Sequence, residues 1–164
     1  PFLAANTTLD PEEGAISLDS FLAYGRLANR HEGPTCGPDR RESTCRPSNL
    51  LQAAVERQAD FVIVAGDIFE DNQIDNRLVH KLISILEQCP LSLYMLPGNH
   101  DPLTPDSIYL RSTLTNGLPH NVHILRTLDP VEVLPGTVLM PAPCCSKKST
   151  SDPTSKWSNV PTDA

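Results

Sequence analysis

Residues 60–71 read Asp-Phe-Val-Ile-Val-Ala-Gly-Asp-Ile-Phe-Glu-Asp, and residues 91–101 read Leu-Ser-Leu-Tyr-Met-Leu-Pro-Gly-Asn-His-Asp. Each stretch begins with an apolar run of strand length and then reaches a glycine followed by polar residues. The run 61–65 is continuous and rich in β-branched residues, which is typical of a strand covered on both faces. These two stretches predict the centre of a sheet.

The segment between them predicts a helix. Apolar residues recur through 74–87 at helical spacing, which indicates one buried stripe. A strand, a helix and a second strand joined by short connections form a right-handed crossover, so the two strands should be parallel. Polar residues that follow parallel strands lie at the carboxyl edge of the sheet, where ligands bind. We therefore expect Gly66-Asp67 and Asn99-His100 to share one edge.

The flanking sequence divides the chain into three parts. Residues 1–47 form an amino-terminal segment with a helical pattern over Ile16–Arg30, followed by a stretch, His31–Pro47, rich in Gly, Pro and charge. That stretch should be irregular, because it offers few apolar side chains to bury. Residues 48–145 form the α/β core, and residues 146–164 form a polar tail. Within the core we also predict a helix from an N-cap at Ser48 to Gln58, a short helix from Asp106 to about Leu114, and strands at 122–125, 131–134 and 137–140.

Six side chains are delivered to the predicted edge, and their chemistry suits divalent cations. Carboxylate oxygen, amide oxygen and imidazole nitrogen bind Mn, Fe, Zn or Mg. A carboxylate can bridge two cations, and two cations roughly 3.5–4 Å apart can hold a phosphate and activate water. Gly66 and Gly98 let the backbone turn where the ligands converge. The six residues are Asp67, Glu70, Asp71, Asn99, His100 and Asp101.

The two stretches resemble motifs of the calcineurin-like metallophosphoesterases. Val64-Ala-Gly-Asp-Ile-Phe-Glu70 resembles the second motif (GDxxD), and Pro97-Gly-Asn-His-Asp101 resembles the third (GNHD or GNHE). The resemblance implies a metallophosphoesterase-type α/β sandwich, present in part, with largely parallel central strands. It also implies a site for two divalent metal ions. Manganese is the favoured metal, and iron, zinc and magnesium are the alternatives.

The resemblance also implies a role for each matching residue. Asp67 would bridge both metals, and Asn99 would bind the second metal. His100 would be the catalytic residue that contacts the phosphate and protonates the leaving oxygen. The last acidic residue of the second motif orients that histidine in some members, and here its position holds glutamate. The acidic residues expected close to the ligands, without binding metal themselves, are Glu70, Asp71 and Asp101.

A narrower resemblance points to DNA. A longer stretch of sequence, about Ser48 to Trp157, is similar to SbcD-type DNA repair exonucleases. The similar segments are VAGDIFEDNQ, LPGNHDPL and a later APxxSK. Those proteins are nuclease subunits that work with an SMC-like ATPase at double-strand ends. The similarity implies DNA as substrate, an SMC-like ATPase as partner and a cytoplasmic location.

Parts of the family pattern are absent. No Asp-x-His of the first motif occurs, and neither does the terminal Gly-His-x-His; His120 and His123 stand in a different context and are predicted to be surface or packing residues. Two ligands are too few for two metals, so we expect a fragment, inactive alone, with a degenerate family member as the alternative. The rival functions are a small-substrate phosphodiesterase or phosphatase, and a non-catalytic remnant that binds a partner or DNA.

Composition sets further limits. The formal charge of −7 is unfavourable for a basic surface that grips polyanions, so bound metals would have to meet the phosphate. No apolar run approaches the ~18 residues of a membrane span. The five cysteines are odd in number and include no Cys-x-x-Cys, which favours reduced thiols over a disulfide framework or a zinc site.

Overall fold

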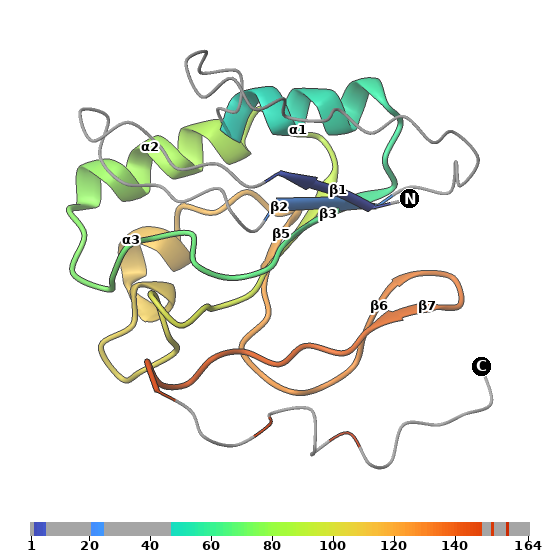
Figure 1. Cartoon of the computed structure of the whole chain (residues 1–164). Helices are drawn as coiled ribbons and strands as arrows, with labels where there is room; N and C mark the ends of the chain where they lie inside the picture. Colours follow the sequence, from blue (N-terminus) through green and yellow to red (C-terminus); the bar gives the residue numbers. More distant parts are fainter. Residues whose placement is uncertain (1, 6–20, 25–46, 149–151, 153–156, 158–164) are drawn as a thin grey trace.

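The computed structural model describes residues 2–5, 21–24, 47–148, 152 and 157. No helix within these residues is both long enough and apolar enough to cross a bilayer. The elements, in chain order, are β1 (Phe2–Ala5), β2 (Phe21–Tyr24), α1 (Pro47–Glu56), β3 (Phe61–Val64), α2 (Asn76–Leu86), β4 (Ser92–Met95), the 3₁₀ helix η2 (Ile108–Leu110), α3 (Ser112–Thr115), β5 (Val122–Ile124), β6 (Val131–Leu134) and β7 (Thr137–Leu139) (Figure 1).

The sheet has the predicted parallel centre. Its strand order is β1-β2-β3-β4-β5, with β3, β4 and β5 parallel and with β1 and β2 added antiparallel at one side. Val64 lies beside Met95, and Met95 lies beside Ile124, so the three central strands end level with one another. The loops that follow β3 and β4 therefore leave the sheet at the same edge. The predicted α/β class is confirmed.

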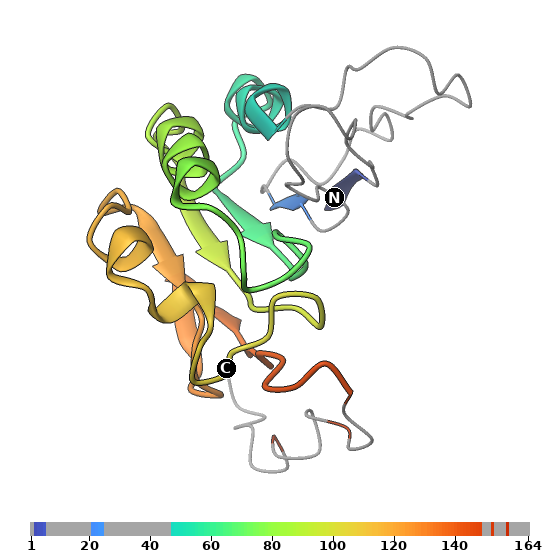
Figure 2. The ribbon, with the colours of Figure 1, turned by 90° about the vertical axis from the view of Figure 1, so that its left-hand side faces the viewer.

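Alternation along the strands covers both faces of the sheet. Val62, Val64, Leu93 and Met95 join the large core beneath α1 and α2. Phe61 and Tyr94 point the other way and form a second cluster with Leu125, against which the β6–β7 residues Val131, Val133, Leu134 and Leu139 pack. Figure 1 shows the two helices and the β6–β7 hairpin on opposite sides of the sheet, and Figure 2 shows the layers turned by 90°.

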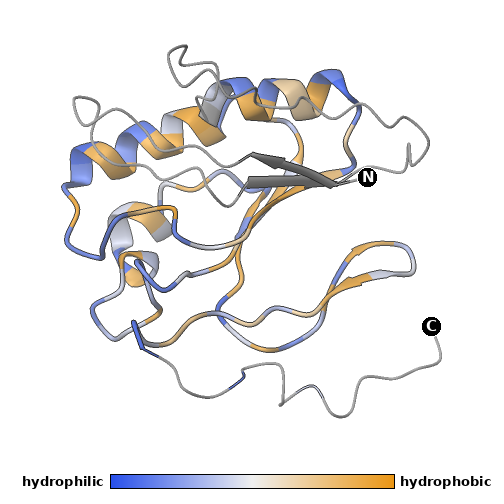
Figure 3. Cartoon of the chain, viewed as in Figure 1, coloured by the Kyte–Doolittle hydropathy of each residue, from blue (hydrophilic) through white to orange (hydrophobic). Residues whose placement is uncertain are grey.

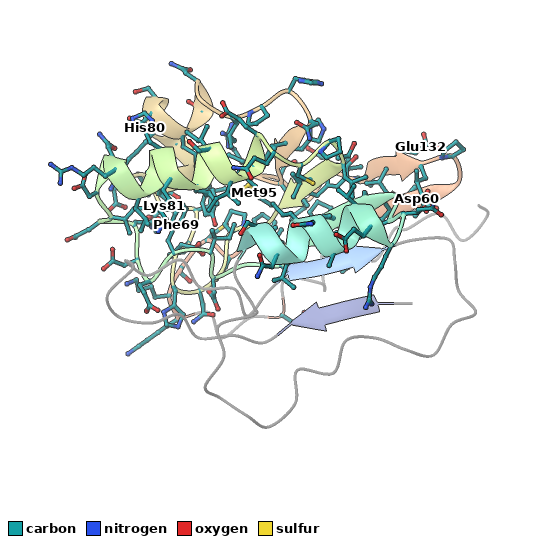
Figure 4. All side chains as sticks on the ribbon, turned by 90° about the horizontal axis from the view of Figure 1, so that it is seen from above. Asp60, Phe69, His80, Lys81, Met95 and Glu132 are labelled. Atoms are coloured by element: carbon teal, nitrogen blue, oxygen red, sulfur yellow. The ribbon has the colours of Figure 1, made fainter. Side chains whose placement is uncertain are left out.

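The helix layer follows from local signals. Asp75 caps α2 by accepting a hydrogen bond from the Arg77 backbone N–H at 3.0 Å. The apolar stripe of α2 faces the sheet (Figure 3), with Val79, Leu82, Ile83 and Leu86 buried. Seen from above, α1 and α2 lie side by side, and His80 and Lys81 belong to the exposed face of α2 (Figure 4).

Three local predictions need correction. The helix predicted over Ile16–Arg30 is wrong at Phe21–Tyr24, which forms β2, because pairing with β3 outweighs a weak helical pattern. Ser48 does not cap α1, because the helix already begins at Pro47, a residue that suits a first turn. The helix expected from Asp106 is two short pieces, η2 and α3, with Ser107 rather than Asp106 as the cap. The irregular stretch predicted at 31–47 lies, apart from Pro47, outside the described residues.

Candidate metal centre

The loop after β3 holds two successive residues in the left-handed region. Gly66 has φ 101° and Asp67 has φ 51°. Aspartate tolerates that region better than most residues, but non-glycine residues there are uncommon and cluster at functional sites. Ile68 and Phe69 follow and are fully buried, so they anchor the loop while Asp67 stays partly exposed. The conformation therefore turns the Asp67 carboxylate outward from a fixed base.

The loops after β3 and β4 touch through their glycines. A Cβ atom placed on Gly66 would lie 2.9 Å from the Gly98 Cα atom, and one placed on Gly98 would overlap the backbone nitrogen and the carboxylate of Asp67. Only hydrogen side chains permit this approach. The role predicted for both glycines, to let the ligands converge, has this steric basis.

The Asp67 carboxylate meets the loop after β4 directly. Its Oδ1 accepts a hydrogen bond from the His100 backbone N–H at 2.9 Å. The Asn99 side-chain amide, with its nitrogen turned inward, lies 3.1 Å from Oδ2 and 3.3 Å from Oδ1 of Asp67. The predicted meeting of Asp67 and Asn99 at one end of the parallel sheet is thus observed, and His100 joins them through its backbone N–H.

The pair Asp67 and Asn99 fits part of a divalent-metal site. The amide nitrogen satisfies the carboxylate when it faces inward, and a half-turn of the amide would present its oxygen instead. Two acceptor oxygens facing each other at such a distance repel, and a bound cation would remove that repulsion. Within residues 47–148 no three His, Cys, Asp or Glu side chains are grouped as a metal site. These two residues would therefore offer hard oxygen atoms to a cation, but fewer than a tightly bound ion requires.

Glu70 lies beside the side chain of His100. The Glu70 Oε2 atom is 3.9 Å from His100 Nδ1, and the two side chains are 60% and 53% exposed. At this exposure the pair adds little to stability, because water screens it. The carboxylate can still favour one orientation of the ring, which leaves the imidazole open to a substrate. Glu70 is therefore close to His100, and its role in orienting that ring stays a prediction.

Asp101 differs from the other acidic residues, because it is completely buried. Its Oδ1 accepts from the backbone N–H groups of Asp67 at 3.2 Å and Gly98 at 2.8 Å. Its Oδ2 accepts from the N–H groups of Ile68 at 2.8 Å and Phe69 at 3.0 Å, and from the Tyr109 hydroxyl at 2.7 Å. With five donors on two oxygens, this carboxylate lies behind Asp67 and is not free to bind a metal.

Tyr109 is a contributor that sequence reasoning missed. It lies on η2, outside both motifs, and nothing in the surrounding sequence marks it. Burial, followed by the negative charges of Asp101 and Asp67 and the hydrogen bond to Asp101, raises the pKa of Tyr109 well above its usual value. The hydroxyl therefore stays protonated and remains a donor to Asp101.

Among the described residues, no hydrogen bond joins Asp71, His120 or His123 to Asp67 or Asn99. Asp71 accepts a hydrogen bond from the Gln73 backbone N–H at 2.6 Å, which is a local turn rather than a contact to the site. His123 stacks on Tyr94 with ring centroids 5.1 Å apart, and His120 is exposed, in agreement with surface and packing roles. The three described cysteines, Cys89, Cys144 and Cys145, are free thiols.

Comparison with known proteins relates this chain to a family of phosphoesterases. Residues 46–147 match the calcineurin-like phosphoesterase family. An uncharacterized metallophosphoesterase of Bacillus subtilis, YhaO, is 30% identical over 87 residues, which is 51% of this chain and 20% of that protein. The SbcD component of nuclease SbcCD from Escherichia coli K12 is 31% identical over 103 residues, 57% of this chain and 25% of that protein.

The matched region is a limited part of those relatives. The chain spans about a fifth to a quarter of their length. No solved structure matches significantly. The family match nevertheless covers well over half of the chain and includes both loops of the site. The chain belongs to the calcineurin-like phosphoesterase family.

Proposed function

We propose that this chain carries part of the catalytic site of a metal-dependent phosphodiester hydrolase that acts on DNA, of the DNA repair exonuclease type. One observation supports the proposal above all others. Two adjacent parallel strands bring the Asp67 carboxylate, the Asn99 amide and His100 together, with the Asn99 amide 3.1 Å from the carboxylate. Membership of a family of phosphoesterases gives that arrangement its chemistry.

In this proposal the chain's residues divide the work. Asp67 and Asn99 would hold divalent ions, of which manganese is favoured, and Asp67 would be the bridging carboxylate. Such ions, when bound, neutralise charge on the phosphate and activate water. His100, exposed and beside Glu70, would contact the phosphate and give a proton to the leaving oxygen. Glu70 would favour the ring orientation that presents the proton.

The choice of DNA rests on the relatives. One of them is named as part of a nuclease, and its similarity extends over 103 residues. With that similarity we also propose a cytoplasmic protein with an SMC-like ATPase as partner. The formal charge of −7 gives the small-substrate phosphodiesterase or phosphatase its specific support, because an acidic surface repels a polyanion. Substrate choice therefore has to be measured on both kinds of ester.

The test uses the protein in its full natural length. We expect Mn²⁺-dependent release of nucleotides from linear double-stranded DNA, with slower cleavage of bis-p-nitrophenyl phosphate. Asp67→Asn removes the charge of the proposed bridge, so metal binding and turnover should fall by more than about 100-fold. Asp106→Asn is the matched control, since Asp106 is an exposed aspartate outside the site that accepts a hydrogen bond from the Thr104 hydroxyl, and it should retain activity.

Each contrary outcome has a definite meaning. Cleavage of the small diester without cleavage of DNA would support the small-substrate alternative. Absence of hydrolysis of either ester, with metal or without, would favour the non-catalytic remnant. Residues 1–164 alone should bind manganese weakly and hydrolyse either ester near the background rate. The reason is that within residues 47–148 Asp67 belongs to no group of three His, Cys, Asp or Glu side chains that could hold the ion.

A further inference from the structure

The buried side chain of Asp101 joins the two loops of the candidate metal centre behind the site. Asp101 is completely buried and accepts four backbone N–H groups, three from the loop after β3 and one from Gly98 in the loop after β4. We propose that Asp101 is the positioning residue of the site, which fixes the Asp67 carboxylate against Asn99 before any cation binds. The effect of Asp101 on metal binding rests on the proposed function, whereas its effect on the position of Asp67 does not.

The hydrogen bonds require a carboxylate. Oδ1 accepts from Asp67 and Gly98, and Oδ2 accepts from Ile68, Phe69 and the Tyr109 hydroxyl. An ionised carboxylate is purely an acceptor, whereas an amide replaces one acceptor with a donor. An asparagine here would therefore turn an NH₂ group toward at least two backbone N–H donors, whichever way it rotates. Asp101→Asn tests the charge and the acceptor pattern with almost no change of volume.

The same hydrogen bonds account for the conformation of Asp67. Three successive N–H groups, from Asp67 to Phe69, can point at one carboxylate only if the backbone curls into a concave turn. Gly66 and Asp67 make that turn with their positive φ angles. In this conformation Asp67 Oδ1 receives the His100 N–H at 2.9 Å, and the Asn99 amide lies beside it. Asp101 thus acts on the ligands through the backbone, without touching a metal or a substrate.

The molecule contains a suitable comparison for a purely structural role. Asn72 is also buried and connects the same two chain segments farther from the site. Its side-chain nitrogen donates to Pro102 O at 2.9 Å and to Thr104 Oγ1 at 3.2 Å, and its oxygen accepts from Ile108 N at 3.1 Å. None of these bonds involves Asp67, Gly98 or Asn99. Asn72→Ala should therefore destabilise the fold without moving the ligands.

The experiment compares the wild-type chain, Asp101→Asn and Asn72→Ala by ¹⁵N-edited NMR. The first readout is metal-free: amide exchange of His100, whose N–H donates to Asp67. In Asp101→Asn the His100 amide should exchange faster than the loss of global stability explains. In Asn72→Ala any change in its exchange rate should match the loss of global stability. The second readout is the Mn²⁺ concentration that half-broadens the signals of residues 67, 99 and 100. It should rise by about 10- to 100-fold in Asp101→Asn, the usual scale for a residue that supports metal ligands, and stay near wild type in Asn72→Ala.

The outcomes separate the two proposals. If manganese broadens the wild type and Asp101→Asn equally, and His100 exchanges alike in both, the positioning role is overturned while the metal site stands. If manganese broadens nothing even in the wild type, the proposed function fails, and the His100 exchange still decides the positioning role.

If Asp101→Asn does not fold, amide exchange in the wild-type protein tests the proposal instead. One carboxylate holds Ile68 and Gly98 and, through Asp67, positions His100, so these three amides should exchange in one opening event. The Ile108 amide, held by Asn72, should exchange separately. Independent exchange of His100 would overturn the proposal.

Discussion

The loops of the metal centre and the β6–β7 hairpin both contain a glycine with positive φ, but they use it in opposite surroundings. Gly66, with φ 101°, lies against Gly98, and that glycine lies against Asp67, so the backbone itself is packed there. Gly136, at the hairpin turn with φ 74°, has open space where a Cβ atom would be. The hairpin glycine is needed only for the turn. The loop glycines also allow the Asp67 and Asn99 side chains to approach each other, so a positive φ occurs in an open turn in one region and in a packed contact in the other.

The largest difference between the two regions should appear in turnover of the full natural protein. His100→Ala should lower turnover on DNA by ~10²–10⁴-fold while metal content stays near wild type, because a proton donor is lost and no ligand is. The fall should be smaller on bis-p-nitrophenyl phosphate, whose leaving group hardly needs a proton. Glu132→Ala in the hairpin, where Glu132 accepts from Gly136 N at 3.2 Å, is the control and should leave turnover unchanged. Loss of metal in His100→Ala would make that residue a ligand.

The next effect is steric and concerns the glycine contact. Gly98→Ala should lower the free energy of unfolding by about 1–3 kcal/mol, because the added methyl group overlaps Asp67 and forces the loops apart. Manganese affinity should fall with it, as measured by the same NMR titration. Chemical denaturation gives the stability. Wild-type stability and affinity in this variant would show that the two loops are not held as closely as the structure describes.

A smaller effect concerns pH and Tyr109. Tyr109→Phe should reduce stability by about 1.5–3 kcal/mol near pH 8, since a hydrogen bond to a charged acceptor is lost. The folded-state pKa of Tyr109 lies above its ordinary value near 10. The stabilisation from the hydroxyl is therefore complete below about pH 10. It declines as the pH rises from there toward the folded-state pKa.

Denaturation of both proteins from pH 8 to 11 measures this difference directly. The gap between wild type and Tyr109→Phe should narrow above about pH 10. A gap that stayed constant across the whole range would contradict the assignment of Tyr109 as a protonated donor to Asp101.

The smallest effect belongs to the hairpin glycine. Gly136→Ala meets no neighbouring atom, so only the unfavourable φ of 74° opposes it, and the loss should be about 1 kcal/mol. Metal binding should not change. Equal losses for Gly136→Ala and Gly98→Ala would remove the distinction between an open turn and a packed contact.

The elements predicted with success are those specified by neighbouring residues. The continuous run at Phe61–Val64, the stripe of α2 and the apolar run of β4 require nothing beyond local pattern, and the parallel pairing follows from their order. The failure at Phe21–Tyr24 has a tertiary cause, because this short apolar segment gains its strand conformation from pairing with β3. Short apolar segments carry too little periodic signal to distinguish the two outcomes.

Motifs and local patterns were enough to predict the family, the strand ends that carry the polar residues, and the meeting of Asp67 with Asn99 and His100. The surroundings of each acidic residue became visible only in the folded chain. Asp71 and Asp101 are the same residue type in neighbouring motifs, yet one makes an exposed turn and the other is buried under five donors. Burial and the direction of backbone N–H groups depend on how the two loops pack, and that packing brings together atoms more than thirty residues apart. No local pattern encodes it, and Tyr109 could not have been foreseen for the same reason.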